Sequence, residues 1–487
     1  MPPGNPAIRL GDFDRGRSVP NWSSTAEFWL VTLVGLSLPL ADIPFFVWRG
    51  FGVDLAHISG SLLILTATAG AVFRSRGRPN LVLSLVATGL LLVPLLPYVF
   101  YRLPGFSVEH FWRSFAHLAF MLAVFLVLSS ANFTTAQFDS ILAILVCEGV
   151  ILALYGIWQT LAYSHGWPTG IGLLNHLSRE PMRGGFFGVW RATATFAEPR
   201  YLANHLLTAI VSAAWLARKR YNRDRRTAAA RWVAALIVMG AGILFTMSLG
   251  GIAALLILVA GMAAAVHRML TRRARLIMTG GLGLLALLVA LYAGASGDSV
   301  SRRLRERLKV EIESPAESLY SLTAPYFSRG FYLHNARYAL LVTNDSPFVG
   351  IGVGQFAAVG NIRGKQLGFP GVVSGGGSWV GVTGMVAEFG LAGVLLFMIL
   401  FLALSQNYPR VPGRPSTTFR FLSLWLLAAV GLEELGPGFY IHLWMWFPLG
   451  LSALGRYISV QRVANLGLTD SPAGDLRRSE PDLRCGR

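Results

Sequence analysis

Apolar runs alternate with short polar segments along almost the whole chain. A helix of about 20 residues crosses the hydrocarbon layer of a bilayer, which is ~30 Å thick. Runs of roughly this length recur along the sequence, which therefore predicts an all-α integral membrane protein with about 12 transmembrane helices. The predicted spans are residues 28–48, 56–73, 80–101, 112–131, 139–161, 194–216, 232–248, 250–267, 275–294, 379–405, 419–434 and 438–456.

The seventh and eighth runs form one apolar stretch that is interrupted only at Ser248-Leu249-Gly250-Gly251. This pattern predicts either a tight helical hairpin or a single kinked helix. The stretch is nearly twice the length of one span, and basic clusters flank both of its ends. Both features favour the hairpin.

Composition and charge agree with a membrane protein. Hydrophobic residues make up 54% of the 487 residues and charged residues 14%, whereas soluble domains carry about 25% charged residues. The formal net charge of +18 could indicate a nucleic-acid-binding protein. The basic residues are mostly arginines in short segments between apolar runs, however, as when positive charge fixes membrane topology. We therefore expect membrane lipids, and no nucleic acid, as partners.

The arginine clusters predict the orientation of the chain. They precede the first span and follow the second, sixth, eighth, tenth and twelfth, at residues 9–17, 74–78, 218–231, 268–275, 410–420 and beyond 456. With twelve spans, all of these segments lie on one side, which the positive-inside rule assigns to the cytoplasm. Both termini are therefore predicted to be cytoplasmic, with two sizeable loops on the outer face of the inner membrane.

This topology divides the chain into seven segments. A cytoplasmic segment (1–27) precedes spans 1–5 (28–161), an outer loop (162–193) and spans 6–9 (194–294). A large outer, periplasmic loop (295–378), spans 10–12 (379–456) and a cytoplasmic tail (457–487) follow. The tail has a composition typical of disordered segments.

Arginine is the main candidate for chemistry outside the membrane. The sequence has no GxxxxGK[ST], HExxH or paired CxxC motif, so we expect no cofactor and no metal. Arg191 and Arg200 belong to the region of the first outer loop, and Arg329 and Arg337 to the second. Guanidinium groups match phosphate oxygens, which suits a membrane-embedded diphosphate. The alternative is that these arginines contact lipid head groups or pair with nearby carboxylates.

Three motifs give the chain a resemblance to a known family. They are Arg191-Ala-Thr-Ala-Thr-Phe-Ala-Glu198-Pro199, Asn344-Asp-Ser-Pro347-Phe-Val-Gly350-Ile-Gly352-Val-Gly354-Gln-Phe356 and Ala387-Glu388-Phe389-Gly390-Leu391-Ala392-Gly393. In order, spacing and topology they resemble motifs of the O-antigen polymerase and O-antigen ligase superfamily of bacterial membrane glycosyltransferases. The resemblance covers about residues 185–400.

The resemblance implies a metal-independent glycosyltransferase that uses a polyprenyl-diphosphate-linked oligosaccharide at the outer face. A hydroxyl attacks the anomeric carbon, and the lipid diphosphate leaves. Arg191 and Arg329, and after them Arg337 and Arg200, are the residues implied to bind the diphosphate and stabilise its developing charge. A protein that regulates chain length is a further partner compatible with this activity.

The general base is where the sequence departs from the family pattern. Ligases of the family carry a histidine before the tenth span, where this chain has Gly377-Ser378-Trp379-Val380. Glu198 is therefore our first candidate for the base, with His334 second; the alternatives are an ion pair for Glu198 and a surface position for His334. Glu388 fits the third motif and is interpreted as a mainly structural residue.

Within the class, the missing histidine and the Phe-Ala-Glu-Pro form of the first motif favour a polysaccharide polymerase. A ligase that transfers finished glycan to an acceptor is the nearest alternative. A transporter or flippase for the same lipid-linked glycan is a third, but the sequence shows no internal repeat, which transporters often carry.

Overall fold

The computed structural model describes residues 22–40, 46–48, 51–73, 80–100, 102–168, 182–184, 189–196, 198–221, 226–267, 339, 342–356, 358–359, 362, 381–405, 417–434 and 443–464. This part of the chain is mostly helical. The helices are α1 (Trp22–Ser37), η2 (Leu38–Leu40, a 3-10 helix), α2 (Leu55–Phe73), α3 (Leu81–Phe100), α4 (Val108–Ser130), α5 (Thr135–His165), α7 (Pro199–Tyr221), α8 (Arg226–Phe245), α9 (Leu249–His267), α15 (Gly381–Ser405), α16 (Thr417–Glu434) and α17 (Leu443–Ala464).

Two short antiparallel hairpins accompany the helices. Strand β1 (Phe46–Trp48) pairs with β2 (Phe51–Val53) just before α2, and β3 (Met182–Gly184) pairs with β4 (Val189–Arg191) between α5 and α7. Each strand has three residues, so the hairpins shape the helix connections and do not form a layer of their own.

Four helical segments in the described residues are long and apolar enough to cross a bilayer: Leu81–Phe100, Val108–Ser130, Thr135–His165 and Thr383–Ser405. Long apolar side chains also face outward on several helices. Leu65, Leu85, Ile151 and Ile237 are each more than 60% exposed. Soluble proteins rarely expose apolar surface on this scale. These features are those of an all-α membrane protein.

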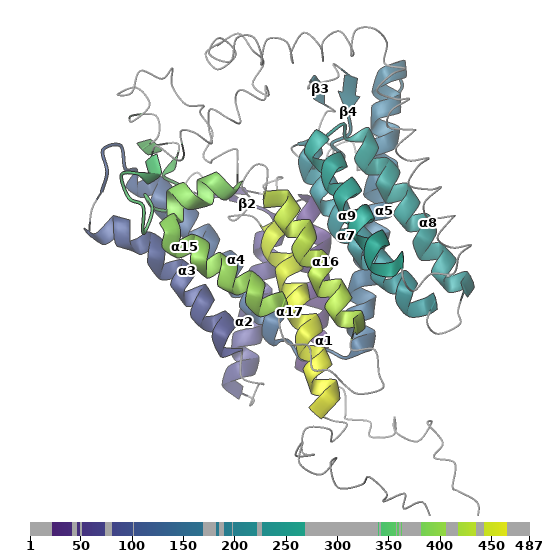
Figure 1. Ribbon diagram of the computed structural model, residues 1–487, viewed down its shortest axis with the longest axis horizontal. Coiled ribbons are helices and arrows are strands. Elements are labelled where there is room, and N and C mark those ends of the chain that lie inside the picture. Colours follow the sequence, from purple (N-terminus) through teal and green to yellow (C-terminus); the bar gives the residue numbers. More distant parts are fainter. Residues whose placement is uncertain are drawn as a thin grey trace, which may run out of the picture.

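The helices form two groups joined by a central one (Figure 1). Helices α5, α7, α8 and α9 pack together on one side, and α2, α3, α4 and α15 lie on the other. Helices α1, α16 and α17 lie between them: α1 contacts α2 and α5, α16 contacts α7, and α17 contacts α4. The hydrophobic core is continuous through both groups.

Small residues allow close packing of α5, α7 and α8. A Cβ added at Gly242 would lie 2.6 Å from the Ala153 Cβ, and one added at Gly149 would lie 2.8 Å from the Ala209 Cβ. Gly149 and Ala153 are four residues apart on α5, the small-xxx-small spacing common between membrane helices. This close packing therefore supports α7, the helix that follows the first motif.

The first predicted span differs from the structure. The helix ends with the 3-10 turn Leu38–Leu40, and residues 46–48 form strand β1, whereas we expected one helix over 28–48. Pro39, which lies in this 3-10 turn, explains the end of the α-helix, because proline has no N–H to donate to a continuing helix. The predicted ninth span, 275–294, lies outside the described residues.

The apolar stretch 232–267 forms two helices and not one kinked helix. Helix α8 ends at Phe245, and α9 begins at Leu249. Between them Met247 has a positive φ of 48°, and the Ser248 Oγ accepts a hydrogen bond from the Gly251 N–H. This turn, residues 246–248, also forms part of the candidate site.

Candidate functional site

The first motif forms an irregular segment between β4 and α7. Gln159, which is 1% exposed on α5, holds this segment in place. Its Oε1 accepts hydrogen bonds from the backbone N–H groups of Thr193 (3.1 Å) and Ala194 (2.9 Å). Ala194 has a φ of 51°, which costs a non-glycine residue about 1–2 kcal/mol. The buried Gln159 amide therefore helps to hold the segment in a strained conformation.

The two arginines that flank this segment, Arg191 and Arg200, lie at the α8–α9 turn. The Arg191 Nε donates to the Thr246 carbonyl oxygen (3.2 Å), and the Ala192 N–H donates to the Phe245 carbonyl oxygen (3.0 Å). On the other side of the turn, a Cβ added at the exposed Gly250 would lie 3.6 Å from the Arg200 guanidinium carbon. Arg191 and Arg200, which are nine residues apart, therefore lie on either side of the same turn.

The electrostatics of this place favour an anion. Arg200 lies in the first turn of α7, and Gly250 in the first turn of α9. Helix N-termini carry a partial positive charge from backbone N–H groups, which adds to that of the guanidinium groups. Glu198 is half-buried immediately before α7, two residues from Arg200. A glutamate and two arginines thus lie within the ten residues from Arg191 to Arg200.

Replacing Gln159 by methionine is expected to destabilise the protein by about 2–3 kcal/mol, because two buried N–H groups lose their acceptor. The change is nearly isosteric, so the loss reports on the hydrogen bonds. Gln159→Glu, which keeps the oxygen acceptors, is the matched control. Denaturant unfolding of the purified protein in micelles measures both. Equal stability of Gln159→Met and the wild type would show that Gln159 does not hold the first motif.

The second and third motifs form one structural unit. Helix α15 is interrupted at Gly390, which has a φ of 61° and a ψ of −166°, a conformation open essentially to glycine alone. At this break, Ile351 and Gly352 donate to the carbonyl oxygens of Ala387 and Glu388. In return, Leu391 and Ala392 donate to those of Pro347 and Phe348. Segment 347–352 thus satisfies the backbone of a broken helix, as membrane proteins require.

Glu388 closes this unit. Its side chain is 1% exposed, and its two carboxylate oxygens accept hydrogen bonds from the Gly354 N–H (2.8 Å) and the Phe356 N–H (3.0 Å). A carboxylate that accepts two backbone N–H groups is a strong, charge-assisted anchor. The structure therefore gives Glu388 a structural role in joining the two motifs.

Aromatic rings gather beside the first motif. Trp158 and His165 both stack on Trp167. The ring centroids are 5.7 Å apart for Trp158 and 4.9 Å apart for His165. Trp190, which precedes Arg191 on β4, lies 4.8 Å from Tyr163. Trp167 is 49% exposed. Rings in this position can stack on sugars or anchor the chain at the membrane interface.

The remaining predicted site residues lie outside the described residues. These are Arg329, His334 and Arg337. Among the residues that the structure describes, no group of three or more His, Cys, Asp or Glu side chains is placed to hold a metal ion.

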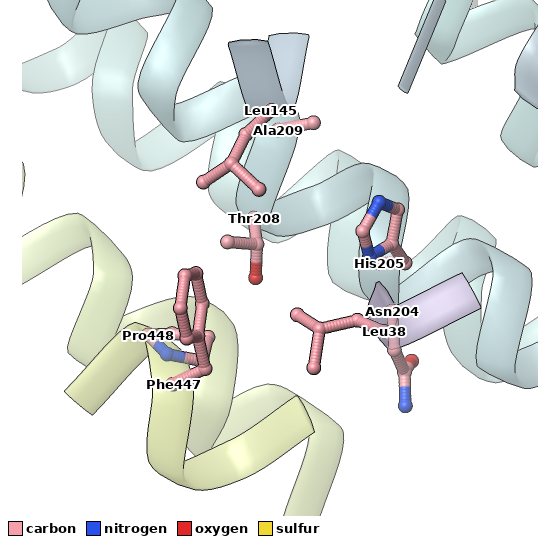
Figure 2. Close-up of a pocket in the computed structure, with 8 residues that line it drawn as sticks. All are labelled: Leu38, Leu145, Asn204, His205, Thr208, Ala209, Phe447 and Pro448. Carbon is pink, nitrogen blue, oxygen red and sulfur yellow. The ribbon is translucent and has the colours of Figure 1, made fainter. Parts of the chain in front are cut away.

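Two ionisable residues of the predicted spans meet in the bundle. Glu148 of α5 and His205 of α7 are both buried, and Oε2 and Nε2 lie 3.6 Å apart. Beside them, Asn204, His205 and Thr208 line a cavity of about 10 Å³ together with Leu38 and Phe447 (Figure 2). That volume holds about one water molecule. This polar group lies beneath the first motif, since the ring of His205 is 5.5 Å from that of Phe196.

The sequence reasoning missed Gln159. The signal was present, because Gln159 is a polar residue inside the apolar run 139–161. Polar groups in such runs are usually retained for a specific hydrogen bond.

Fold and site together define the class: a mostly helical membrane protein that carries two guanidinium groups at one end of the bundle. Comparisons with protein-family models and with curated proteins gave no match to this sequence.

Proposed function

We propose that the chain is a polysaccharide polymerase that joins polyprenyl-diphosphate-linked oligosaccharide repeat units at the outer face of the cytoplasmic membrane. The observation that carries the proposal is the position of Arg191 and Arg200 on either side of the α8–α9 turn. A leaving diphosphate gathers negative charge as the glycosidic bond breaks. Fixed guanidinium groups and helix N-termini stabilise such charge without having to reorganise.

Charge asymmetry along α7 supports an outer location for this site. Arg191 and Arg200 lie at the N-terminal end of α7, whereas Arg218, Lys219 and Arg220 occupy its last turn. Under the positive-inside rule the basic end faces the cytoplasm. The proposed topology has twelve spans with both termini cytoplasmic, which leaves the diphosphate site on the periplasmic or exterior side.

In the proposed reaction, a hydroxyl of the acceptor glycan attacks the anomeric carbon of the donor. The bond from that carbon to the diphosphate oxygen breaks, and the carrier lipid leaves as its diphosphate. Glu198 is the proposed base that takes the hydroxyl proton, with His334 as the alternative. Arg329 and Arg337 are the further residues proposed to bind the diphosphate.

Replacing Arg191 or Arg200 by alanine should lower the rate of chain extension about 100-fold, since each change removes a positive charge that stabilises the leaving diphosphate. Cells carrying either variant should accumulate single repeat units on the carrier lipid and lose long chains. Arg191→Lys should be intermediate, because lysine keeps the charge but not the planar fork. Arg102→Ala is the matched control, since Arg102 is an arginine at the end of α3 that lies outside the site. Lipid-linked glycans are sized after extraction, at matched protein abundance.

Other results would contradict the polymerase. Long chains that stay on the carrier lipid and never reach an acceptor would make the protein a ligase. Repeat units trapped in the cytoplasmic leaflet would make it a flippase. Unchanged glycans in both alanine variants would reject the diphosphate site.

A further inference from the structure

A second cavity lies between α2 and α4, on the opposite side of the bundle from the first motif (Figure 1). Its volume is about 860 Å³, within the range of small-molecule sites. One part of its wall is apolar, formed by Ile58, Leu62 and Phe120. The other part carries polar groups. A cavity lined in this way fits an amphiphile.

Hydrogen-bonding groups at the polar part are held in fixed positions. The Asp54 Oδ1 lies 2.8 Å from the His57 Nδ1 and also accepts from the His57 backbone N–H. The His57 Nε2 and the His117 Nδ1 share a hydrogen bond of 3.3 Å. His57 lines the cavity, and its ring stacks on Phe120 with centroids 5.2 Å apart. The carboxylate and the second imidazole therefore fix the ring that faces the ligand.

The charged groups at the cavity are one guanidinium and two carboxylates. The Arg113 Nη2 donates to the Glu109 Oε1 at 2.7 Å, so the guanidinium already has a carboxylate partner. Asp54 adds a second carboxylate nearby. A diphosphate or another strongly anionic head would meet these carboxylates. An uncharged head with many hydroxyl groups fits better, because hydroxyls both donate and accept.

Trp112 supplies an aromatic surface beside these groups. It is 44% exposed and lines the same cavity as Glu109 and Arg113. A sugar ring has an apolar C–H face and a rim of hydroxyls, and an exposed indole next to a carboxylate–guanidinium pair offers a partner for each.

The second motif fixes the helix that carries these residues. The Gln355 side chain accepts from the Ser107 N–H (2.8 Å) and donates to the Ser107 carbonyl oxygen (3.0 Å). Gly354 lies so close to α4 that an added Cβ would be 2.1 Å from the Ser114 Oγ. The start of α4 is therefore positioned by the unit that Glu388 closes.

We propose that the cavity between α2 and α4 binds an amphiphile with an uncharged sugar head. Trp112 stacks on the sugar ring, and His57, Glu109 and Arg113 bond its hydroxyls. Ile58, Leu62 and Phe120 contact the hydrocarbon tail. This binding is separate from the proposed function and does not rest on it.

The test is photo-crosslinking of the full chain in lipid nanodiscs with a diazirine-labelled dodecyl maltoside, below the concentration that dissolves the discs. Labelled peptides from α2 and α4 are expected. Trp112→Ala should lower this labelling about 5-fold, as expected for the loss of one aromatic contact. Excess dodecyl phosphocholine, which has the same tail and no sugar, should not compete. Trp29→Ala, at a tryptophan that is 61% exposed on α1, is the matched control.

Two results would overturn the proposal. Equal labelling of Trp112→Ala and wild type, at equal thermal stability, would show that Trp112 contacts no sugar. Equal competition by dodecyl phosphocholine would show a groove for any lipid tail. Neither result touches the diphosphate site, which is tested by Arg191→Ala and Arg200→Ala alone.

Discussion

Replacing Glu388 by alanine is expected to lower the free energy of unfolding by about 3–5 kcal/mol. The carboxylate accepts two backbone hydrogen bonds, from Gly354 and Phe356, and is 1% exposed. Alanine takes away both charge-assisted hydrogen bonds and leaves two buried N–H groups without this acceptor. Denaturant unfolding in micelles gives the free energy. Limited proteolysis should then cut within segment 347–356, because that segment loses its attachment to α15.

Glu109→Ala is the control for Glu388→Ala. Its carboxylate pairs with Arg113, but the side chain is 75% exposed. Exposed ion pairs contribute little, so the stability should change by less than about 1 kcal/mol. If Glu388→Ala were as mild as Glu109→Ala, the second and third motifs would not depend on this carboxylate.

Replacing Gly350 by alanine is expected to destabilise the protein by about 3–5 kcal/mol, through two additive causes. The first is φ, which is +72° at this residue. The second is space: an added Cβ would lie 2.4 Å from the backbone carbonyl carbon and oxygen of Glu388. These are backbone atoms, so no side-chain rotation relieves the contact. The expected result is loss of the pairing between segment 347–352 and the break in α15.

Two other glycines separate these causes. Gly166 has a φ of 70° with no atom within 4 Å of an added Cβ, so Gly166→Ala should cost only about 1–2 kcal/mol. Gly431, inside α16, has open space as well, and its substitution by alanine should be neutral or slightly stabilising. Thermal unfolding of the three variants should follow the order Gly350, Gly166, Gly431, from most to least destabilised. Similar values for Gly350→Ala and Gly166→Ala would reject the close backbone approach.

The family-like motifs gain a physical interpretation from these contacts. Gly350 and Gly390 allow two backbones to touch, and Glu388 fixes the end of the loop. Gly354 and Gln355 hold that loop on α4. The second and third motifs are therefore explained by structure alone. The first motif is different, because Arg191 at its start and Arg200 directly after it lie on either side of the α8–α9 turn.

The sequence by itself determined which segments are helices. Helix length in a membrane protein follows from the thickness of the bilayer, and an apolar run of about 20 residues can be recognised without knowledge of its neighbours. That is why ten of the predicted spans correspond to helices of the structure, within a few residues at most ends, while the ninth lies outside the described residues. The first span is the exception, because its helix ends early in a 3-10 turn that contains Pro39. The charge pattern likewise follows from local composition, and it remains a prediction of orientation.

Only the tertiary structure decided which of these residues meet. Glu148 and His205 are 57 positions apart, Gln159 and Ala194 are 35 apart, and Gln355 and Ser107 are 248 apart. A hydrophobic run gives the length of a helix, but lipid-facing and core-facing sides are both apolar, so it does not give the neighbour. The break at Gly390 is likewise stabilised only in the folded protein, where segment 347–352 pairs with the backbone groups around it. Helix packing therefore decides which buried polar groups form pairs. A buried polar group is stable only when a neighbouring helix supplies its hydrogen-bond partner.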